Sequence, residues 1–153
     1  MKIYLDTNIY CRPFDDCSQL RIALEAEAVL RLWQKAEEGE IVCLYSKLIM
    51  LELSKMPLLK WQEIKKFVQL VNEDIPYSDD IKKLAEKIVK FKKIPAYDAL
   101  HLSFAAYGQA DLFLTCDDDI LRKILVIEEL FRTEKLTSSI LNPIQFIQNY
   151  FTF

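Results

Sequence analysis

Short apolar segments alternate with longer segments of helical periodicity along almost the whole chain. The first apolar segment, residues 2–5, precedes a segment over 20–38 in which Leu20, Leu24 and Leu32 recur at helical spacing. Such alternation predicts strands joined by crossover helices, and therefore a mainly parallel sheet covered on both faces. We accordingly expect a three-layer α/β/α fold.

The same patterns predict where the individual elements lie. The expected strands span 2–5, 41–45, 74–76, 112–115 and 137–141. The expected helices span 20–38, 47–55, 61–71, 79–92, 95–107 and 120–125, and a last helix opens at Pro143. Ser46 is expected to cap the helix that follows it. Gly39 and Gly108 stand where two helices should stop.

Size and composition indicate one folded domain over residues 1–153. The chain has 153 residues, of which 52% are hydrophobic, so it can bury a sizeable core. No apolar run approaches the roughly 20 residues that span a bilayer. The N-terminus does not resemble a signal peptide, so we expect a cytoplasmic protein. The four cysteines show no CxxC spacing and are expected to be reduced core thiols rather than zinc ligands.

Four acidic residues lie in or beside apolar segments. Asp6 and Asp117 follow predicted strands, Glu52 interrupts the apolar segment 48–53, and Asp98 opens a predicted helix. An unpaired buried carboxylate is costly or takes up a proton, so four such residues suggest one shared site. The carboxyl ends of parallel strands meet at one edge of a sheet, and there a hard divalent cation would bind through oxygen.

Such a site favours metal-dependent phosphoryl chemistry. Mg²⁺ or Mn²⁺ neutralises the charge that develops on phosphorus oxygens and lowers the pKa of the attacking water. A haloacid-dehalogenase-like phosphatase would need a second Asp two residues after Asp6, where this chain has Asn8. Nucleotide-binding loops are excluded because their glycines are missing.

The ordered motifs around these acids resemble the PIN-domain ribonucleases, especially the VapC-type toxins of toxin–antitoxin pairs. The resemblance covers nearly the whole chain. It rests on Leu5-Asp6-Thr7-Asn8, Ser46 with Leu51-Glu52-Leu53, Tyr97-Asp98-Ala99-Leu100-His101-Leu102, Leu114-Thr115-Cys116-Asp117-Asp118 and Ile140-Leu141-Asn142-Pro143.

The resemblance implies a role for each residue of these motifs. The catalytic and metal-binding acids would be Asp6, Glu52, Asp98 and Asp117. The supporting polar residues would be Asn8 and Thr115, with Asp118 as a further candidate. Arg12, in the segment Arg12-Pro13-Phe14-Asp15-Asp16, is a candidate contact to a substrate phosphate, and an ion pair with Asp15 or Asp16 is the alternative.

The implied function is that of an Mg²⁺-dependent endoribonuclease in which Mn²⁺ can substitute. The implied partners are an RNA substrate, a small antitoxin and a second copy of the chain; a membrane is not among them. The alternative is a PIN-fold binding or scaffold protein with little catalysis. His101 is expected to be a packed helix histidine rather than a neighbour of the acids.

Charge leaves one question open. The net charge of −3 argues against a nucleic-acid partner, yet it becomes +1 when the four acids are left out. The segment 81–93 carries six lysines and one glutamate. It would either follow a phosphate backbone or form a solvated helix face.

Overall fold

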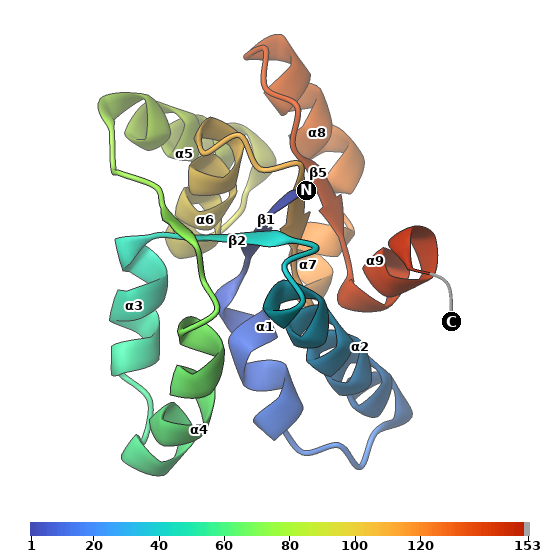
Figure 1. Cartoon of the computed structure of the whole chain (residues 1–153). Coiled ribbons are helices and arrows are strands. Elements are labelled where there is room, and N and C mark those ends of the chain that lie inside the picture. Colours follow the sequence, from blue (N-terminus) through green and yellow to red (C-terminus); the bar gives the residue numbers. More distant parts are fainter. Residues whose placement is uncertain (152–153) are drawn as a thin grey trace.

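A five-stranded parallel sheet forms the centre of the molecule. The structure, a computed structural model, describes residues 1–151. The strand order is β3-β2-β1-β4-β5, and every pair is parallel (Figure 1). The strands are β1 (Lys2–Leu5), β2 (Val42–Tyr45), β3 (Glu73–Asp74), β4 (Leu112–Leu114) and β5 (Ser139–Leu141).

Helices cover both faces of this sheet, as the alternating sequence pattern predicts. In Figure 1, α5, α6 and α8 lie on one side, and α2, α4 and α9 lie on the other. The helices are α1 (Thr7–Cys11), α2 (Leu20–Glu37), α3 (Lys47–Ser54), α4 (Leu58–Val68), α5 (Asp79–Lys92), α6 (Ala96–Tyr107), α7 (Asp118–Leu121), α8 (Ile124–Thr133) and α9 (Pro143–Tyr150), with a 3-10 helix η1 (Arg12–Phe14). The predicted three-layer α/β/α fold is confirmed.

The central strands are buried because helices cover both of their faces. In β1, Ile3 pairs with Cys43 of β2 on one side and with Leu112 of β4 on the other. Tyr4 is fully buried, and its ring stacks on Phe113 at 5.8 Å between centroids. The middle of the sheet is therefore a rigid apolar support for whatever follows β1 and β4.

The strand order reverses direction between β1 and β4. The chain leaves β1 for β2 on one side, whereas it leaves β4 for β5 on the other. Right-handed crossovers then place the two connections on opposite faces. A crevice at the carboxyl ends of these two strands is where open α/β sheets bind ligands.

The structure corrects several predicted elements. The segment over 120–125 is not one helix, because α7 ends at Leu121 and α8 begins at Ile124. Neither α1 nor η1 was expected, and α4 begins at Leu58, three residues before the predicted start. Gly108 ends α6 at an ordinary helical φ of −73°, so its role is packing: a Cβ there would collide with the Ile75 side chain.

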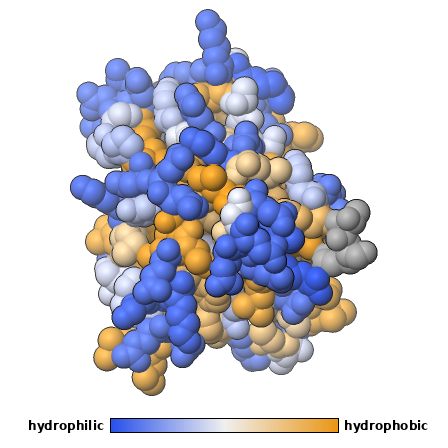
Figure 2. All heavy atoms as spheres, in the orientation of Figure 1, coloured by the Kyte–Doolittle hydropathy of each residue, from blue (hydrophilic) through white to orange (hydrophobic). Residues whose placement is uncertain are grey.

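An exposed thiol and several large apolar side chains interrupt the polar surface. Three cysteines are buried as expected, but Cys17 is exposed. Within residues 1–151, no helix is both long enough and apolar enough to cross a membrane. Apolar patches nevertheless interrupt the polar surface in Figure 2. The exposed large apolar side chains include Leu51, Leu58 and Leu59 of α3 and α4.

Candidate functional site

Asp6 is held in place by polar contacts where β1 ends and α1 begins. Its Oδ1 accepts a hydrogen bond from the Thr7 backbone N–H at 2.8 Å. Its Oδ2 accepts from Asn8 Nδ2 at 2.9 Å and from Thr115 Oγ1 at 2.7 Å. Only 4% of Asp6 is exposed, and this burial raises its pKa although Thr115, Thr7 and the charge of His101 oppose the shift.

The segment after β4 is joined to the same group. Asn8 Oδ1 accepts from the Cys116 N–H at 3.0 Å, and Thr115 Oγ1 accepts from the Asp117 N–H at 3.0 Å. Asp117 then caps α7, since its Oδ1 accepts from the backbone N–H groups of Asp119 and Ile120. The capping group is thus Asp117 itself, rather than one of the two aspartates that follow it.

A buried polar chain holds Glu52 on α3. His101 is 1% exposed, and its Nε2 lies 2.6 Å from Glu52 Oε1. Its Nδ1 lies 2.8 Å from Tyr4 Oη, which is hydrogen-bonded to Ser46 Oγ at 2.8 Å. An ionised carboxylate only accepts, so Nε2 donates to Glu52, and Nδ1 shares a hydrogen bond with the Tyr4 hydroxyl group.

These hydrogen bonds change the interpretation of two residues. His101 is a direct partner of Glu52, whereas the sequence favoured a purely packed histidine. Ser46 bonds Tyr4 and makes no side-chain cap to α3. Burial raises the pKa of Glu52, but the hydrogen bond and charge of His101 outweigh it and leave that pKa below its ordinary value.

Burial and the charges of the other three acids raise the pKa of Asp98. It lies in the first turn of α6. Burial, followed by the charges of Asp6 and Asp117, raises its pKa from 3.8 to about 6, with a smaller contribution from Glu52. We call Asp6, Glu52, Asp98 and Asp117 the acidic cluster. Two of these acids lie at strand–helix connections, one lies in the first turn of α6 and one lies within α3.

The donor set of the acidic cluster suits a hard divalent cation. All four members are carboxylates, and the neighbouring thiol of Cys116 is unsuited because burial raises its pKa to about 12. Among residues 1–151, no three His, Cys, Asp or Glu side chains are arranged closely enough to hold an ion. The fit is therefore one of chemistry and charge: negative charge is concentrated where Asp98 already resists ionisation.

Arg12 and Asp118 are engaged elsewhere. Arg12 Nη1 lies 3.1 Å from Asp15 Oδ2, which is the ion pair named as the alternative to a phosphate contact. Asp118 Oδ1 lies 2.7 Å from Arg21 Nη2. Neither residue belongs to the hydrogen bonds that hold Asp6 or Glu52.

Comparison with known proteins identifies the fold family. The PIN domain family matches residues 3–124. The chain belongs to the PIN domain family. PIN domains are generally nucleases and generally use divalent metals. The match covers every member of the acidic cluster.

A solved structure resembles this PIN domain in fold. The crystal structure of FitAcB from Neisseria gonorrhoeae matches with a TM-score of 0.52 and 15% identity, over 92% of this chain and 97% of the other. At that identity the likeness concerns the fold alone. No curated protein sequence matches significantly.

Proposed function

We propose that this PIN domain is a metal-dependent endoribonuclease that hydrolyses RNA phosphodiester bonds and acts as the toxin of a toxin–antitoxin pair. The observation that supports the proposal is the PIN domain match over residues 3–124, which spans Asp98 and three acids whose charges act on it, two of them following the adjacent strands β1 and β4. A phosphodiester is anionic, so a site with this much negative charge must bind a cation before it can bind a phosphodiester.

The four acids would hold Mg²⁺, with Mn²⁺ able to substitute. When bound, the ion would supply charge neutralisation on the phosphate and a lowered pKa for the attacking water. Asn8 and Thr115 orient Asp6, and His101 orients Glu52. These contacts remove rotational freedom from the carboxylates before substrate arrives, which favours productive geometry.

Large apolar side chains are exposed on α3 and at the start of α4. Leu51 precedes Glu52 on α3 and is 48% exposed, while Leu58 and Leu59 at the start of α4 are 68% and 79% exposed. Exposed apolar side chains of this size suit a protein partner. They support a small antitoxin that covers the acidic cluster, and a homodimer remains part of the proposal through the family resemblance. A cytoplasmic location accords with such a role.

The decisive experiment is cleavage of a mixed RNA pool by the purified protein. The reactions contain Mg²⁺, Mn²⁺ or EDTA, and the variants are Asp6→Asn and the matched control Asp79→Asn, which changes an exposed aspartate on α5. We expect metal-dependent cleavage by the wild type and by Asp79→Asn, but not by Asp6→Asn. Cleavage that persists in EDTA or in Asp6→Asn would contradict the proposal.

The alternative is a PIN-fold binding or scaffold protein. Its signature would be tight RNA or protein binding without cleavage in any metal, by a folded wild type free of bound antitoxin. The toxin role has a separate test: induced expression should arrest bacterial growth, and Asp6→Asn should relieve the arrest.

A further inference from the structure

Three consecutive aspartates follow β4, and two of them have an arginine partner. Asp118 is paired with Arg21 through two contacts, of 2.7 Å and 2.9 Å. Asp119 is paired with Arg122 at 2.6 Å. Within residues 1–151, no ion pair involves Asp117. Ion pairs thus neutralise the charges of Asp118 and Asp119, whereas the charge of Asp117 is available to the other three acids of the acidic cluster.

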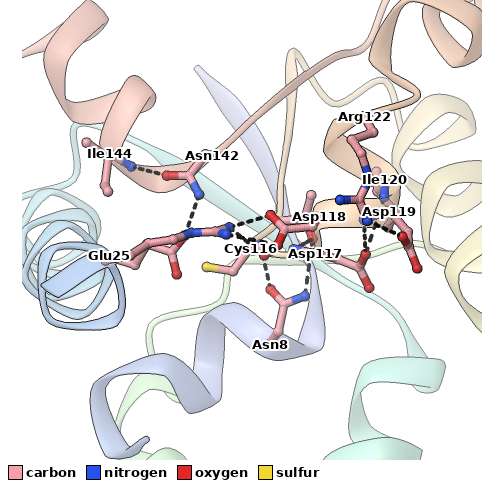
Figure 3. A network of polar contacts seen from close by, with 12 residues as sticks. Asn8, Glu25, Cys116, Asp117, Asp118, Asp119, Ile120, Arg122, Asn142 and Ile144 are labelled. Atoms are coloured by element: carbon pink, nitrogen blue, oxygen red, sulfur yellow. Dashed lines mark hydrogen bonds and ion pairs between the residues drawn. The ribbon is translucent and has the colours of Figure 1, made fainter. Parts of the chain in front are cut away.

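Arg21 is anchored at its other end by a buried carboxylate. Glu25 on α2 is 1% exposed, and its Oε1 lies 3.0 Å from Arg21 Nε. Its Oε2 forms an ion pair with Arg12 Nε at 3.0 Å, and Asn142 Nδ2 donates to Oε1 at 2.7 Å. Figure 3 shows Glu25 and Asn142 side by side, with Cys116 and Asp118 next to them. Glu25 thus ties together η1, α2 and the start of α9.

This anchorage matters because Arg21 is half exposed. A solvent-exposed arginine–aspartate pair contributes little, since ordering two long side chains offsets the attraction. Glu25 already orders the guanidinium group of Arg21, so less side-chain entropy is lost when the group also binds Asp118. The buried Arg21–Glu25 pair therefore strengthens the exposed Arg21–Asp118 pair.

The peptide before Asp117 is consequently held on both sides. The Cys116 N–H donates to Asn8 Oδ1 at 3.0 Å, on the side of the acidic cluster. The Cys116 carbonyl accepts from Arg21 Nη2 at 3.4 Å, on the side of α2. Asp117 follows directly and has its own N–H on Thr115.

We propose that Arg21, anchored on Glu25, is a positioning residue that holds the segment 116–118 so that Asp117 faces the acidic cluster. Its catalytic consequence rests on the proposed function. The role also accounts for Arg12 at the start of the Arg12–Asp16 segment, because Arg12 binds Glu25 Oε2 while Arg21 binds Oε1. Neither arginine needs to touch substrate.

The test compares Arg21→Gln with Arg122→Gln. Both variants remove one arginine charge beside Asp117, but only Arg21 connects the segment to a buried anchor. Charge alone predicts that both variants bind Mn²⁺ more tightly, since each makes the site more negative. The positioning role predicts the opposite sign for Arg21→Gln, with Mn²⁺ affinity about tenfold or more weaker, as for other residues that orient metal ligands. Equal or tighter binding by Arg21→Gln in calorimetry would overturn the proposal.

A second measurement needs neither metal nor RNA. In metal-free protein, the amides of Asp119 and Ile120 should exchange with deuterium faster in Arg21→Gln than in Arg122→Gln, because both donate to Asp117 Oδ1. Equal exchange would count against the positioning role. This readout decides the inference even if the wild type cleaves no RNA, which would instead refute the proposed function.

Arg21→Lys separates charge from geometry. Lysine keeps the charge, but it cannot bond Glu25 and Asp118 with one planar fork. We expect Arg21→Lys to bind Mn²⁺ as weakly as Arg21→Gln does. Both variants should also have a lower kcat than wild type, with an unchanged KM for RNA. Full recovery by lysine would show that the charge alone matters and would overturn the proposal.

Discussion

The hydroxyl group of Tyr4 links the core to the acidic cluster. It lies between Ser46 and His101, and His101 in turn holds Glu52. Burial raises the pKa of Tyr4 well above its ordinary value, so the group stays a neutral hydroxyl. The residues that orient Glu52 are therefore carried by β1 and α6, which are rigid parts of the fold.

Tyr4→Phe tests this buried chain. The change leaves Ser46 Oγ and His101 Nδ1 each without their buried partner, so we expect the free energy of unfolding to fall by about 1–3 kcal/mol. Urea denaturation measures the change. The matched control is Tyr77→Phe, which removes a hydroxyl from a residue that is 58% exposed and should stay within about 0.5 kcal/mol of wild type. Similar losses in both variants would mean that the hydrogen bonds of Tyr4 contribute nothing to the free energy of unfolding.

Asp98→Asn tests the crowding of charge within the acidic cluster. The folded-state pKa of about 6 lies above the ordinary value of 3.8, so folding favours the protonated acid. The contribution of Asp98 to stability is therefore present below about pH 4 and is lost as the pH rises through about 6. In EDTA at pH 7.5, Asp98→Asn should be more stable than wild type by about 1 kcal/mol, after allowance for solvent screening of this half-buried group.

The pH series supplies the control for Asp98→Asn. At pH 4 the two proteins should have the same Tm, because the acid is then protonated in the folded wild type. Mn²⁺ at pH 7.5 should raise the Tm of wild type more than that of Asp98→Asn, through linkage to binding. An equal gain in both proteins would show that Asp98 does not share a metal site with the other acids.

At the scale of the elements, sequence predicted long amphipathic helices well and short ones poorly. The bounds of α5 match the predicted 79–92, because Ser78 caps its start and apolar residues repeat over four turns. The short helix α1 was missed since its five residues, Thr7–Cys11, are too few to show a period. The single helix predicted over 120–125 is wrong, because α7 ends at Leu121 and α8 begins at Ile124, with Arg122 and Lys123 between them.

The same scale explains which site residues could be foreseen. The four acids stand out in sequence because each interrupts or borders an apolar segment. The roles of His101, Ser46 and Arg21 depend instead on contacts between residues far apart in the chain, such as the pairs His101–Glu52 and Arg21–Asp118. Spacing along one helix cannot reveal such contacts. The only hint in the sequence that His101 lies near the acids is its place three residues after Asp98 on α6.

Asn142→Ala tests a residue that both caps α9 and binds Glu25. Asn142 caps α9 by accepting from the Ile144 N–H at 2.8 Å, and it also donates to buried Glu25. The loss of both should cost about 2–3 kcal/mol in urea denaturation. Ser78→Ala is the matched comparison, because Ser78 only caps α5, and its loss should cost about 1 kcal/mol. A smaller loss for Asn142→Ala than for Ser78→Ala would contradict the role of Glu25 as an anchor.

At the scale of the molecule, the strand order brings two of the four acids to the same edge of the sheet. Asp6 and Asp117 follow the adjacent strands β1 and β4, and the connections from these strands leave in opposite directions. Sequence predicted the alternation and the carboxyl-end placement. It did not give the strand order, which depends on packing between residues far apart in the chain. Only that order makes β1 and β4 neighbours.

The lysine-rich helix α5 supplies the last prediction. It packs beside α6, whose first turn carries Asp98, so a bound RNA strand could run from the acidic cluster onto it (Figure 1). If exposed Lys83 and Lys90 contact phosphates, Lys83→Gln/Lys90→Gln should raise KM for RNA and leave kcat unchanged. The slope of log kcat/KM against log salt should also become shallower by about 1.4, at roughly 0.7 for each lost phosphate contact.

The control for α5 is Lys65→Gln/Lys66→Gln on α4, across the sheet. It removes the same two charges, so both variants change the net charge from −3 to −5, by −3 − 2. A phosphate-following helix predicts an effect for the α5 variant alone, measured as cleavage rates between about 50 and 200 mM salt. Equal effects would mean that long-range charge, rather than contact, steers RNA. No effect of either variant would show that α5 is simply a solvated helix face.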